Sequence, residues 1–184
     1  DAKLTLGGDA DNTRGTVSAT GVLTAEIAGA ADNTAGTLVA NQAVTLAAGS
    51  LTNTRGSIQS VQAGVQANVA GHLANGEGGA TGAATDLNLQ AGSLANAGNL
   101  RAGNDVGVRV NGAMTQAGSL TAGRHATVTA ASLDAGSDSV LGAGVQNDGS
   151  LGTAGDLRIT TTGALAAAGQ NLAAGDATLQ GASV

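Results

Sequence analysis

The sequence of 184 residues contains no cysteine, no proline and no aromatic residue. Without cysteine there can be neither a disulfide framework nor a thiolate metal site. Without proline every residue keeps a backbone N–H donor, so strand ladders can run through the chain without interruption. Without Phe, Tyr or Trp a globular core would be hard to fill, because aromatic side chains dominate burial in ordinary domains. The composition therefore favours a narrow core of small aliphatic residues.

Charge is also scarce, at 11% charged residues with a net charge of −6. Disordered chains usually combine high net charge with low hydrophobicity, so we expect a folded protein. A nucleic-acid partner needs basic patches and is not expected. No apolar run approaches the roughly 18 residues of a membrane span, so we do not expect the chain to be membrane-spanning. No signal peptide is visible and the first residues already read as a strand, which predicts that residues 1–184 are a segment excised from a longer filament.

What the sequence does contain is an internal repeat of about twenty residues. The longest alternating apolar run of each unit recurs at spacings of 21, 21, 22, 19, 20, 31 and 20 residues, and it begins at Leu23, Val44, Val65, Leu87, Val106, Ala126, Leu157 and Ala177. Strict alternation indicates a strand with one buried face. A second apolar column recurs with a similar spacing, at Val17, Leu38, Ile58, Ala80, Leu100, Leu120, Leu151 and Leu172. A third, shorter column runs through Leu51, Leu73, Leu94, Met114, Leu133 and Leu165.

Three short strands per unit describe one coil of a parallel β-helix. Stacked coils lie about 4.8 Å apart, so eight coils predict a rod of roughly 40 Å. Left-handed β-helices repeat every eighteen residues with a hexapeptide pattern, which these units lack, and parallel crossovers are right-handed by default. A leucine-rich repeat has a similar period, but its second segment is helical or extended, which the three alternating runs do not fit. The predicted fold is all-β, a right-handed parallel β-helix of about 20-residue coils forming a single domain.

A column of asparagines follows the third apolar column, and a glycine comes two or three residues later. We predict that stacked amides hydrogen-bond along the axis as a structural ladder, and that the glycine permits a cramped or left-handed backbone at the corner. The ladder is expected at Asn12, Asn33, Asn53, Asn75, Asn96 and Asn147, with Gln116 filling one gap.

One unit is longer than the others. Leu133 is followed by its asparagine only at Asn147, whereas Leu94 has Asn96 two residues later, which predicts a loop insertion at residues 134–145. Such insertions leave a solenoid on one face and often carry specificity. The candidate binding residues of this insertion are Asp134, Ser137, Asp138 and Ser139.

An acidic column precedes the longest strands at Asp86, Asp105, His125, Asp156 and Asp176. Stacked carboxylates could bind calcium or act as an acid–base pair. Ordinary turn chemistry at a strand start explains the same residues. We therefore predict no catalytic residue, no metal ligand and no cofactor, and we do not expect an enzyme.

Four segments follow the consensus most closely: Leu51-Thr-Asn-Thr-Arg-Gly-Ser-Ile58, Leu94-Ala-Asn-Ala-Gly-Asn-Leu100, Asp156-Leu-Arg-Ile-Thr-Thr-Thr-Gly163 and Gly169-Gln-Asn-Leu-Ala-Ala-Gly175. In these segments the sequence resembles the haemagglutinin repeats of filamentous haemagglutinin-type exoproteins of two-partner secretion. The resemblance implies a protein secreted to the bacterial outer cell surface through an outer-membrane secretion partner. It also implies a shaft that projects a distal adhesive or contact-dependent growth-inhibition toxin region.

Three functions follow from these observations. The leading hypothesis is a structural shaft segment whose partners are the adjoining coils of the same chain. An alternative is a carbohydrate- or receptor-binding adhesin module that uses the 134–145 insertion to contact a host or target-cell receptor or glycan. A third is a polysaccharide-cleaving β-helix enzyme, which the sparse carboxylates disfavour.

Overall fold

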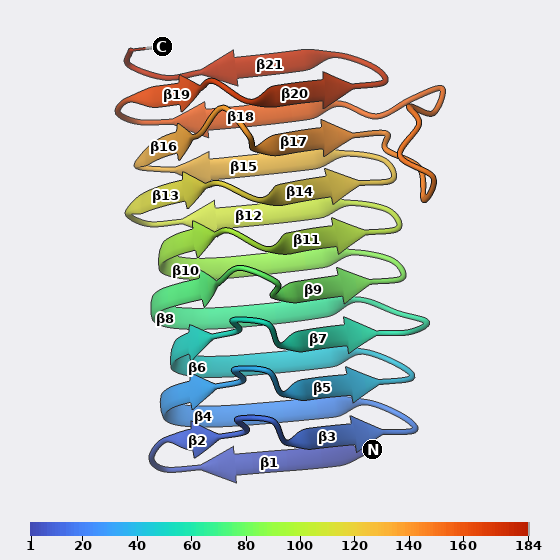
Figure 1. Cartoon of the computed structure of the whole chain (residues 1–184), viewed down its shortest axis with the longest axis vertical. Coiled ribbons are helices and arrows are strands. Elements are labelled where there is room, and N and C mark those ends of the chain that lie inside the picture. The colour runs from blue at the N-terminus through green and yellow to red at the C-terminus, as the bar shows by residue number, and fades with distance from the viewer. Residues whose placement is uncertain (184) are drawn as a thin grey trace.

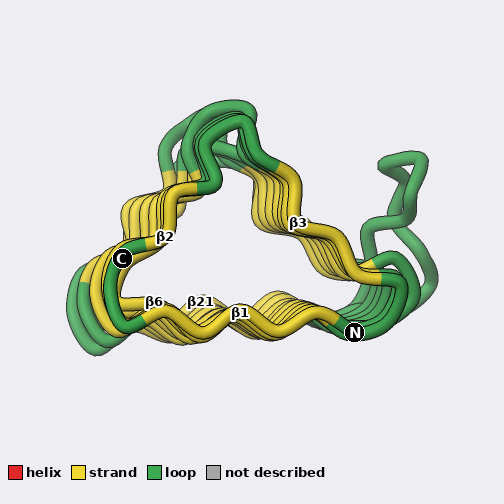
Figure 2. Tube along the Cα trace, turned by 90° about the horizontal axis from the view of Figure 1, so that it is seen from below, coloured by secondary structure: helices red, strands yellow, loops and turns green. Residues whose placement is uncertain are grey.

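The computed structural model describes residues 1–183 and contains parallel strands stacked into a single column (Figure 1). No helix lies in this range, so none is long and apolar enough to cross a membrane. Each coil has three limbs, which form the three sides seen along the axis in Figure 2. The fold class predicted from the repeat is confirmed.

The first limb builds the longest ladder. Nine strands pair in the order β1 (Ala2–Leu6), β4 (Leu23–Asp32), β6 (Val44–Thr52), β8 (Val65–Asn75), β10 (Leu87–Asn96), β12 (Val106–Val110), β15 (Ala126–Ala130), β18 (Leu157–Thr161) and β21 (Ala177–Gln180). Every neighbouring pair is parallel. The column has nine coils where the sequence predicted eight, because the alignment began at Leu23 and omitted β1.

The second limb is short and lies after a bend. In four coils it is the carboxyl-terminal part of a first-limb strand, in β4, β6, β8 and β10, and elsewhere it is β2 (Ala10–Asp11), β13 (Ala113–Gln116), β16 (Ser132–Ala135) or β19 (Leu165–Ala167). The register shifts at the bend, for example between Ile27 and Ala30, which allows one strand to turn the corner.

The third limb forms a separate eight-stranded parallel sheet. Its members are β3 (Thr16–Ala19), β5 (Thr37–Ala40), β7 (Ser57–Ser60), β9 (Ala80–Ala83), β11 (Asn99–Ala102), β14 (Ser119–Ala122), β17 (Val140–Ala143) and β20 (Gln170–Ala173). Seen from its amino-terminal end, the chain turns clockwise as it recedes (Figure 2), so the helix is right-handed, as predicted.

The core is a set of aliphatic columns, one residue per coil. In the first limb the predicted positions pair in register from Leu23 to Ala177, and in the second limb from Leu51 to Leu165. Most of these side chains are less than 9% exposed. Each fully buried Leu, Val or Ile stabilises the fold by about 1.5–3 kcal/mol relative to an exposed one.

The third-limb column differs from the prediction at three coils. Leu100 pairs with Thr81 and not with Ala80, Leu120 pairs with Leu141 and not with Leu151, and Leu141 pairs with Asn171 and not with Leu172. The alignment preferred the nearest apolar residue, although Thr81 and Asn171 occupy the inward register positions. Leu151 is 48% exposed because it belongs to a loop outside the coil.

Candidate functional site

The amide column is a continuous chain of side-chain hydrogen bonds. Each Nδ2 donates to the amide oxygen of the next coil, from Asn12 to Asn33 (2.7 Å), Asn33 to Asn53 (2.8 Å), Asn53 to Asn75 (2.9 Å), Asn75 to Asn96 (2.8 Å) and Asn96 to Gln116 (3.0 Å). From Asn33 to Gln116 these side chains are at most 1% exposed. The same Nδ2 groups also reach backbone carbonyls, as Asn96 does at Ser119 (3.0 Å). Because buried amides are costly when unpaired, the column fixes the coil register.

The prediction that Asn147 extends this column is wrong. Asn147 is exposed and lies beside the third limb, where its Oδ1 accepts a hydrogen bond from Arg101 (2.6 Å). The position after Gln116 in the column belongs to Ala135, and the next to Ala167. Sequence spacing cannot distinguish a missing asparagine from a displaced one, which is why the alignment reached forward to Asn147.

The corner after each amide brings neighbouring coils into close backbone contact. A Cβ at Gly56 would overlap the carbonyl oxygen of Asn33, and one at Gly36 would overlap that of Asn12. The left-handed conformation falls one residue earlier, at Arg14 (φ 58°), Ala35 (φ 54°) and Arg55 (φ 54°). The corner glycine is therefore required for close approach between coils.

The column at the strand starts links side chains to the backbone of the next coil. The Oδ1 of Asp86 accepts from the backbone N–H of Asp105 (3.2 Å), and the Oδ1 of Asp105 accepts from His125 (3.1 Å). His125 Nδ1 then accepts from the N–H of Asp156 (3.1 Å), whose Oδ1 accepts from Asp176 (3.0 Å). These side chains act as corner caps, which is the turn chemistry predicted as the alternative to calcium binding.

Asp105 has the strongest electrostatic partner in that column. Arg124 donates to it from Nε (2.8 Å) and from a terminal nitrogen (2.6 Å). The hydrogen bonds from Arg124 lower the pKa of Asp105, opposed by partial burial and assisted by the His125 N–H. Within residues 1–183 no group of three or more His, Cys, Asp or Glu side chains is arranged to hold a metal ion.

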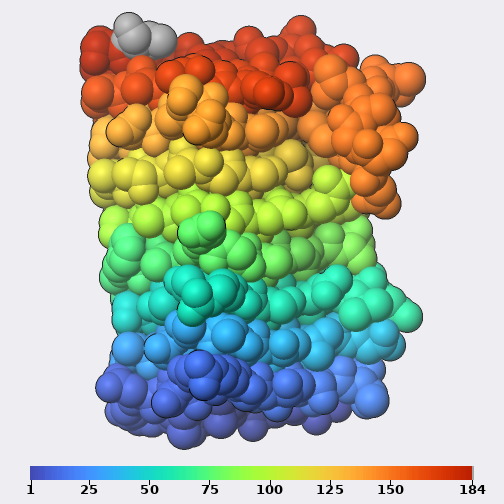
Figure 3. Space-filling model, viewed as in Figure 1, coloured from blue at the N-terminus to red at the C-terminus, as the bar shows by residue number. Residues whose placement is uncertain are grey.

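The predicted insertion lies further along the chain than residues 134–145. Residues 132–135 and 140–143 are the regular strands β16 and β17, and the segment between them is an ordinary corner. The connection from β17 to β18 covers residues 144–156, thirteen residues where other coils use three or four. This segment, called the strap below, stands out from the side of the column in Figure 3.

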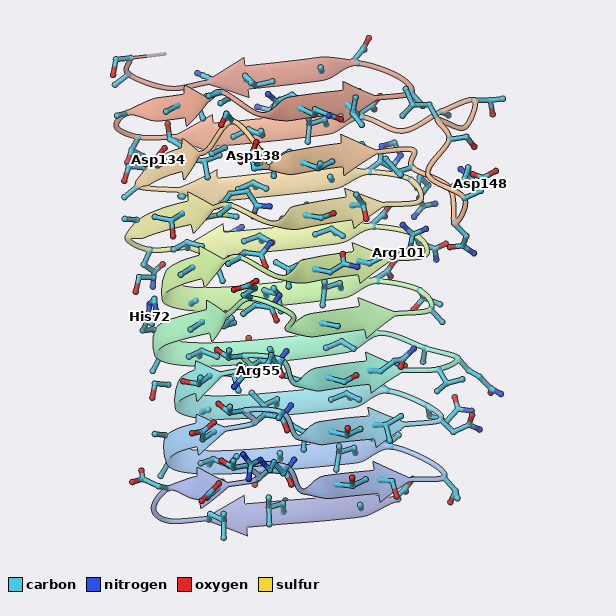
Figure 4. All side chains as sticks on the ribbon, in the orientation of Figure 1. Arg55, His72, Arg101, Asp134, Asp138 and Asp148 are labelled. Carbon is cyan, nitrogen blue, oxygen red and sulfur yellow. The ribbon has the colours of Figure 1, made fainter. Side chains whose placement is uncertain are left out.

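Of the four candidate binding residues, Asp134 lies on β16, and Ser137, Asp138 and Ser139 lie in the ordinary corner between β16 and β17. Asp134, Ser137 and Asp138 are exposed, whereas Ser139 is 1% exposed and donates its hydroxyl to the carbonyl of Gly136 (2.7 Å). In Figure 4 Asp134 lies at the left of the column and Asp148 of the strap at the right, with Asp138 between them. The sequence revealed that one unit was long, but the displaced Leu151 and Asn147 hid which connection was extended.

The strap is held against the third-limb sheet. The backbone N–H of Val145 donates to the carbonyl of Ala122 (2.9 Å), and Val145 forms an antiparallel bridge with Leu151. Arg101, two coils away, donates to Asn147 of the strap and to Thr121 (3.3 Å). Figure 4 shows Arg101 below the strap residue Asp148. Sequence analysis did not single out Arg101, because its partner is 46 residues away.

These features define a class of protein: a right-handed parallel β-helix repeat whose ordered polar side chains mainly tie one coil to the next. The haemagglutinin repeat family matches residues 1–77, 59–100, 82–144 and 135–184, which together cover the chain. The chain belongs to the haemagglutinin repeat family, as its resemblance predicted. Membership of this family suggests a structural role and an extracellular or cell-surface location in general terms.

Two curated proteins contain similar stretches. A stretch of 52 residues is 56% identical to the toxin CdiA of Yersinia pestis and covers 28% of this chain and 2% of that protein. A stretch of 48 residues is 50% identical to the tRNA nuclease CdiA-2 of Burkholderia pseudomallei (strain 1026b) and covers 26% of this chain and 2% of that protein. The similarity thus concerns a small repeat region of both relatives. No solved structure matches the chain.

Proposed function

We propose that this chain is a structural shaft segment of a secreted, cell-surface filament of the haemagglutinin-like or contact-dependent inhibition type. The observation that carries the proposal is the unbroken nine-strand parallel ladder. Its register is fixed by a buried amide column along one corner. Such a ladder resists bending because every coil shares hydrogen bonds with the coils on either side.

The shaft would act mechanically and not as a catalyst. The carboxylates at the strand starts accept backbone N–H groups of the next coil, so they serve the stacking. In this proposal the distal part of the parent protein carries the adhesive or toxic activity, and an outer-membrane secretion partner exports the chain. The adjoining coils of the parent protein would cover both ends of the column.

The test lengthens the shaft in the parent protein without changing its register. Residues 23–176 comprise seven complete coils, from the start of β4 to the residue before β21. A second copy of this range inserted between Asp176 and Ala177 should lengthen the filament by about 34 Å, at about 4.8 Å per coil. Electron microscopy of the secreted filament measures the length.

The matched control duplicates residues 33–176, which begins ten residues later and breaks the register. The proposal expects a lengthened, straight filament from the in-register copy and a kinked or unexported one from the control. An in-register copy that forms a separate globular bulge, with no added length, would refute the shaft role.

A further inference from the structure

The strap is looped out of a coil that closes without it. Gly144 keeps the place of an ordinary corner residue, since its backbone N–H donates to the carbonyl of Arg124 in the preceding coil (2.8 Å). The coil resumes at Gly155, whose carbonyl accepts from the N–H of Gly175 in the following coil (2.9 Å). A Cβ at Gly155 would overlap the backbone of Gly144, so the two backbones touch and close the neck of the loop. Compact surface loops of about 6–16 residues whose ends meet in this way are frequently functional.

Beyond this neck the strap is exposed and weakly held. Residues 146–151 are all exposed, and so are Thr153 and Ala154. Within residues 1–183 the one hydrogen bond that joins residues 146–154 to the rest of the column is the contact of Asn147 with Arg101 (2.6 Å). The other hydrogen bonds of this stretch lie inside the strap. Opening the strap therefore breaks little structure, which places it among the least stable parts of the fold.

The other connections between the third and first limbs are tied to the column through their backbone. In the β11–β12 corner the N–H of Gly103 donates to the carbonyl of Ala83 in the preceding coil (3.0 Å). The N–H of Asn104 in the same corner donates to the carbonyl of Thr85 (2.8 Å). An endoprotease binds its substrate as an extended strand through backbone hydrogen bonds, so such a corner would have to leave the column before it could be cut.

Leu151 gives the strap a side chain that an endoprotease can select. Within residues 1–183 the exposed large apolar side chains are Leu151 (48% exposed) and Val61 (51%). Val61 lies in the β7–β8 corner, where its N–H donates to the carbonyl of Ala40 (3.0 Å). The chain has no aromatic residue, and its one methionine, Met114, is 1% exposed. Leu151 therefore combines an apolar side chain for a specificity pocket with a backbone that is free to extend.

A cut in the strap leaves the ladders between coils in place. The chain after the strap pairs with the chain before it in all three limbs, β18 with β15, β19 with β16 and β20 with β17. Leu157 and Ile159 of β18 are 0% exposed, and Leu165 of β19 is 2% exposed. The two pieces would be held together by the same backbone hydrogen bonds and core contacts that join any two coils.

We propose that the strap is a proteolytic processing site, at which an endoprotease with an apolar specificity pocket divides the chain without dividing the column. The protease hydrolyses the peptide bond between Leu151 and Gly152. One water adds across this bond, the C–N bond breaks, and the products are a carboxylate on Leu151 and an amino group on Gly152. Arg101 restrains the site, because its hydrogen bond to Asn147 opposes the extended conformation that the protease requires. This proposal does not depend on the shaft role, since it needs only the column and its loop.

The test digests the folded 184-residue chain with chymotrypsin, which in the absence of aromatic residues cuts mainly after leucine. Mass spectrometry locates the first cut, and gel filtration under native conditions reports whether the pieces stay together. We expect a first cut after Leu151 that gives residues 1–151 and 152–184, and we expect both pieces to elute together at the volume of the intact chain. Trypsin is the comparison enzyme and should leave the strap uncut, because residues 144–156 contain no Lys or Arg.

Three variants test the role of each residue. Leu151→Thr should slow the first cut about tenfold or more, because the specificity pocket of the protease loses its apolar partner. Val61→Thr is the matched control at the other exposed apolar side chain and should leave the rate unchanged. Arg101→Ala should speed the cut about fivefold, since the loss of one hydrogen bond raises the open population by about that factor and the rate of cleavage follows this population. None of the three changes removes a residue of the buried core columns, so the melting temperature should stay as in the parent chain.

Several outcomes would overturn the proposal. They are a first cut outside the strap, pieces that separate on gel filtration, an equal loss of rate in Val61→Thr, and a folded chain that resists chymotrypsin at a concentration that digests the chain unfolded in urea. An unchanged rate in Arg101→Ala would overturn the restraining role of Arg101.

Discussion

Replacing one amide in the middle of the ladder should destabilise the whole column. Asn53 is 0% exposed, accepts from Asn33 (2.8 Å) and donates to Asn75 (2.9 Å) and to the carbonyl of Ala80 (3.2 Å). Leucine has the same branching and the same number of side-chain heavy atoms but a larger volume, so Asn53→Leu removes these bonds without opening a cavity and adds some crowding. Asn33 keeps contacts to backbone carbonyls, but the Oδ1 of Asn75 loses its side-chain donor.

The expected cost is about 1–3 kcal/mol, the cost of leaving a buried polar group unsatisfied. Urea denaturation followed by far-ultraviolet circular dichroism gives the free energy of unfolding. Asn147→Leu is the control and should change it by less than about 0.5 kcal/mol. Equal costs at Asn53 and Asn147 would refute the reasoning.

A double variant sharpens the same test. Asn53→Leu with Asn75→Leu removes both partners of one ladder bond, so the amide oxygen orphaned by the single variant is no longer present. The double variant should therefore cost less than the sum of its two single variants, by about 1 kcal/mol. Strict additivity would show that the two amides do not interact.

Three further predictions follow from the corners and the strap. Gly56→Ala should cost about 1–3 kcal/mol in unfolding free energy because its Cβ overlaps a neighbouring coil, while Gly82→Ala, which meets open space, should cost less than about 1 kcal/mol. Asp105→Asn should lower the melting temperature slightly at pH 7, where the exposed ion pair contributes at most about 1 kcal/mol. Because folding lowers the pKa of Asp105, this difference should be present above about pH 4 and vanish as the pH falls through the folded-state pKa. Arg101→Ala should speed amide hydrogen exchange in residues 144–156 without changing the melting temperature, and unchanged exchange there would contradict the anchoring role of Arg101.

The repeat in the sequence predicted the architecture well because each core column takes one residue from each coil. Each inward position of the first limb pairs only with its equivalents, so alignment at Leu23, Val44 and Val65 gives the register directly. A small inward residue in one coil, such as Ala126, leaves the pairing with the coils on either side in register. Because equivalent residues recur in every coil, short motifs were enough to predict the first and second limbs of almost the whole column.

The sequence alignment assigned the wrong residue to a core column where a polar residue occupies an inward position or where an apolar residue lies outside the coil. Asn171 takes the place of a core leucine, and its Nδ2 donates to the corner carbonyls of Ala167 and Gly169 (3.1 and 3.2 Å). Leu151 is apolar but exposed on the strap. Composition gives no sign of either exchange, because both depend on how the backbone turns at the corner and in the strap.

The arginine contacts were equally hidden from the sequence. Arg101 reaches the strap, whereas Arg109 takes part in no ion pair within residues 1–183, although both are arginines near the middle of the chain. Their difference depends on whether the side chain projects from the third or the first limb. The three-limbed cross-section has to be known before either role can be assigned.

The register of the stacked coils is the central claim, and cross-linking tests it most directly. Thr45 and Gln66 are paired neighbours on the outer face of the first limb, whereas Asn68 pairs with Ala47, two residues further along. The chain has no cysteine of its own, so introduced pairs report without interference. Strand partners about 4.8 Å apart satisfy disulfide geometry, while a pair offset by two residues, about 8 Å apart, does not.

The measurement is the extent of disulfide formation in the folded chain under mild oxidation. Thr45→Cys with Gln66→Cys should close nearly completely, and Thr45→Cys with Asn68→Cys should stay reduced. Equal oxidation of both pairs, or oxidation of the offset pair alone, would contradict the register and with it the β-helical column.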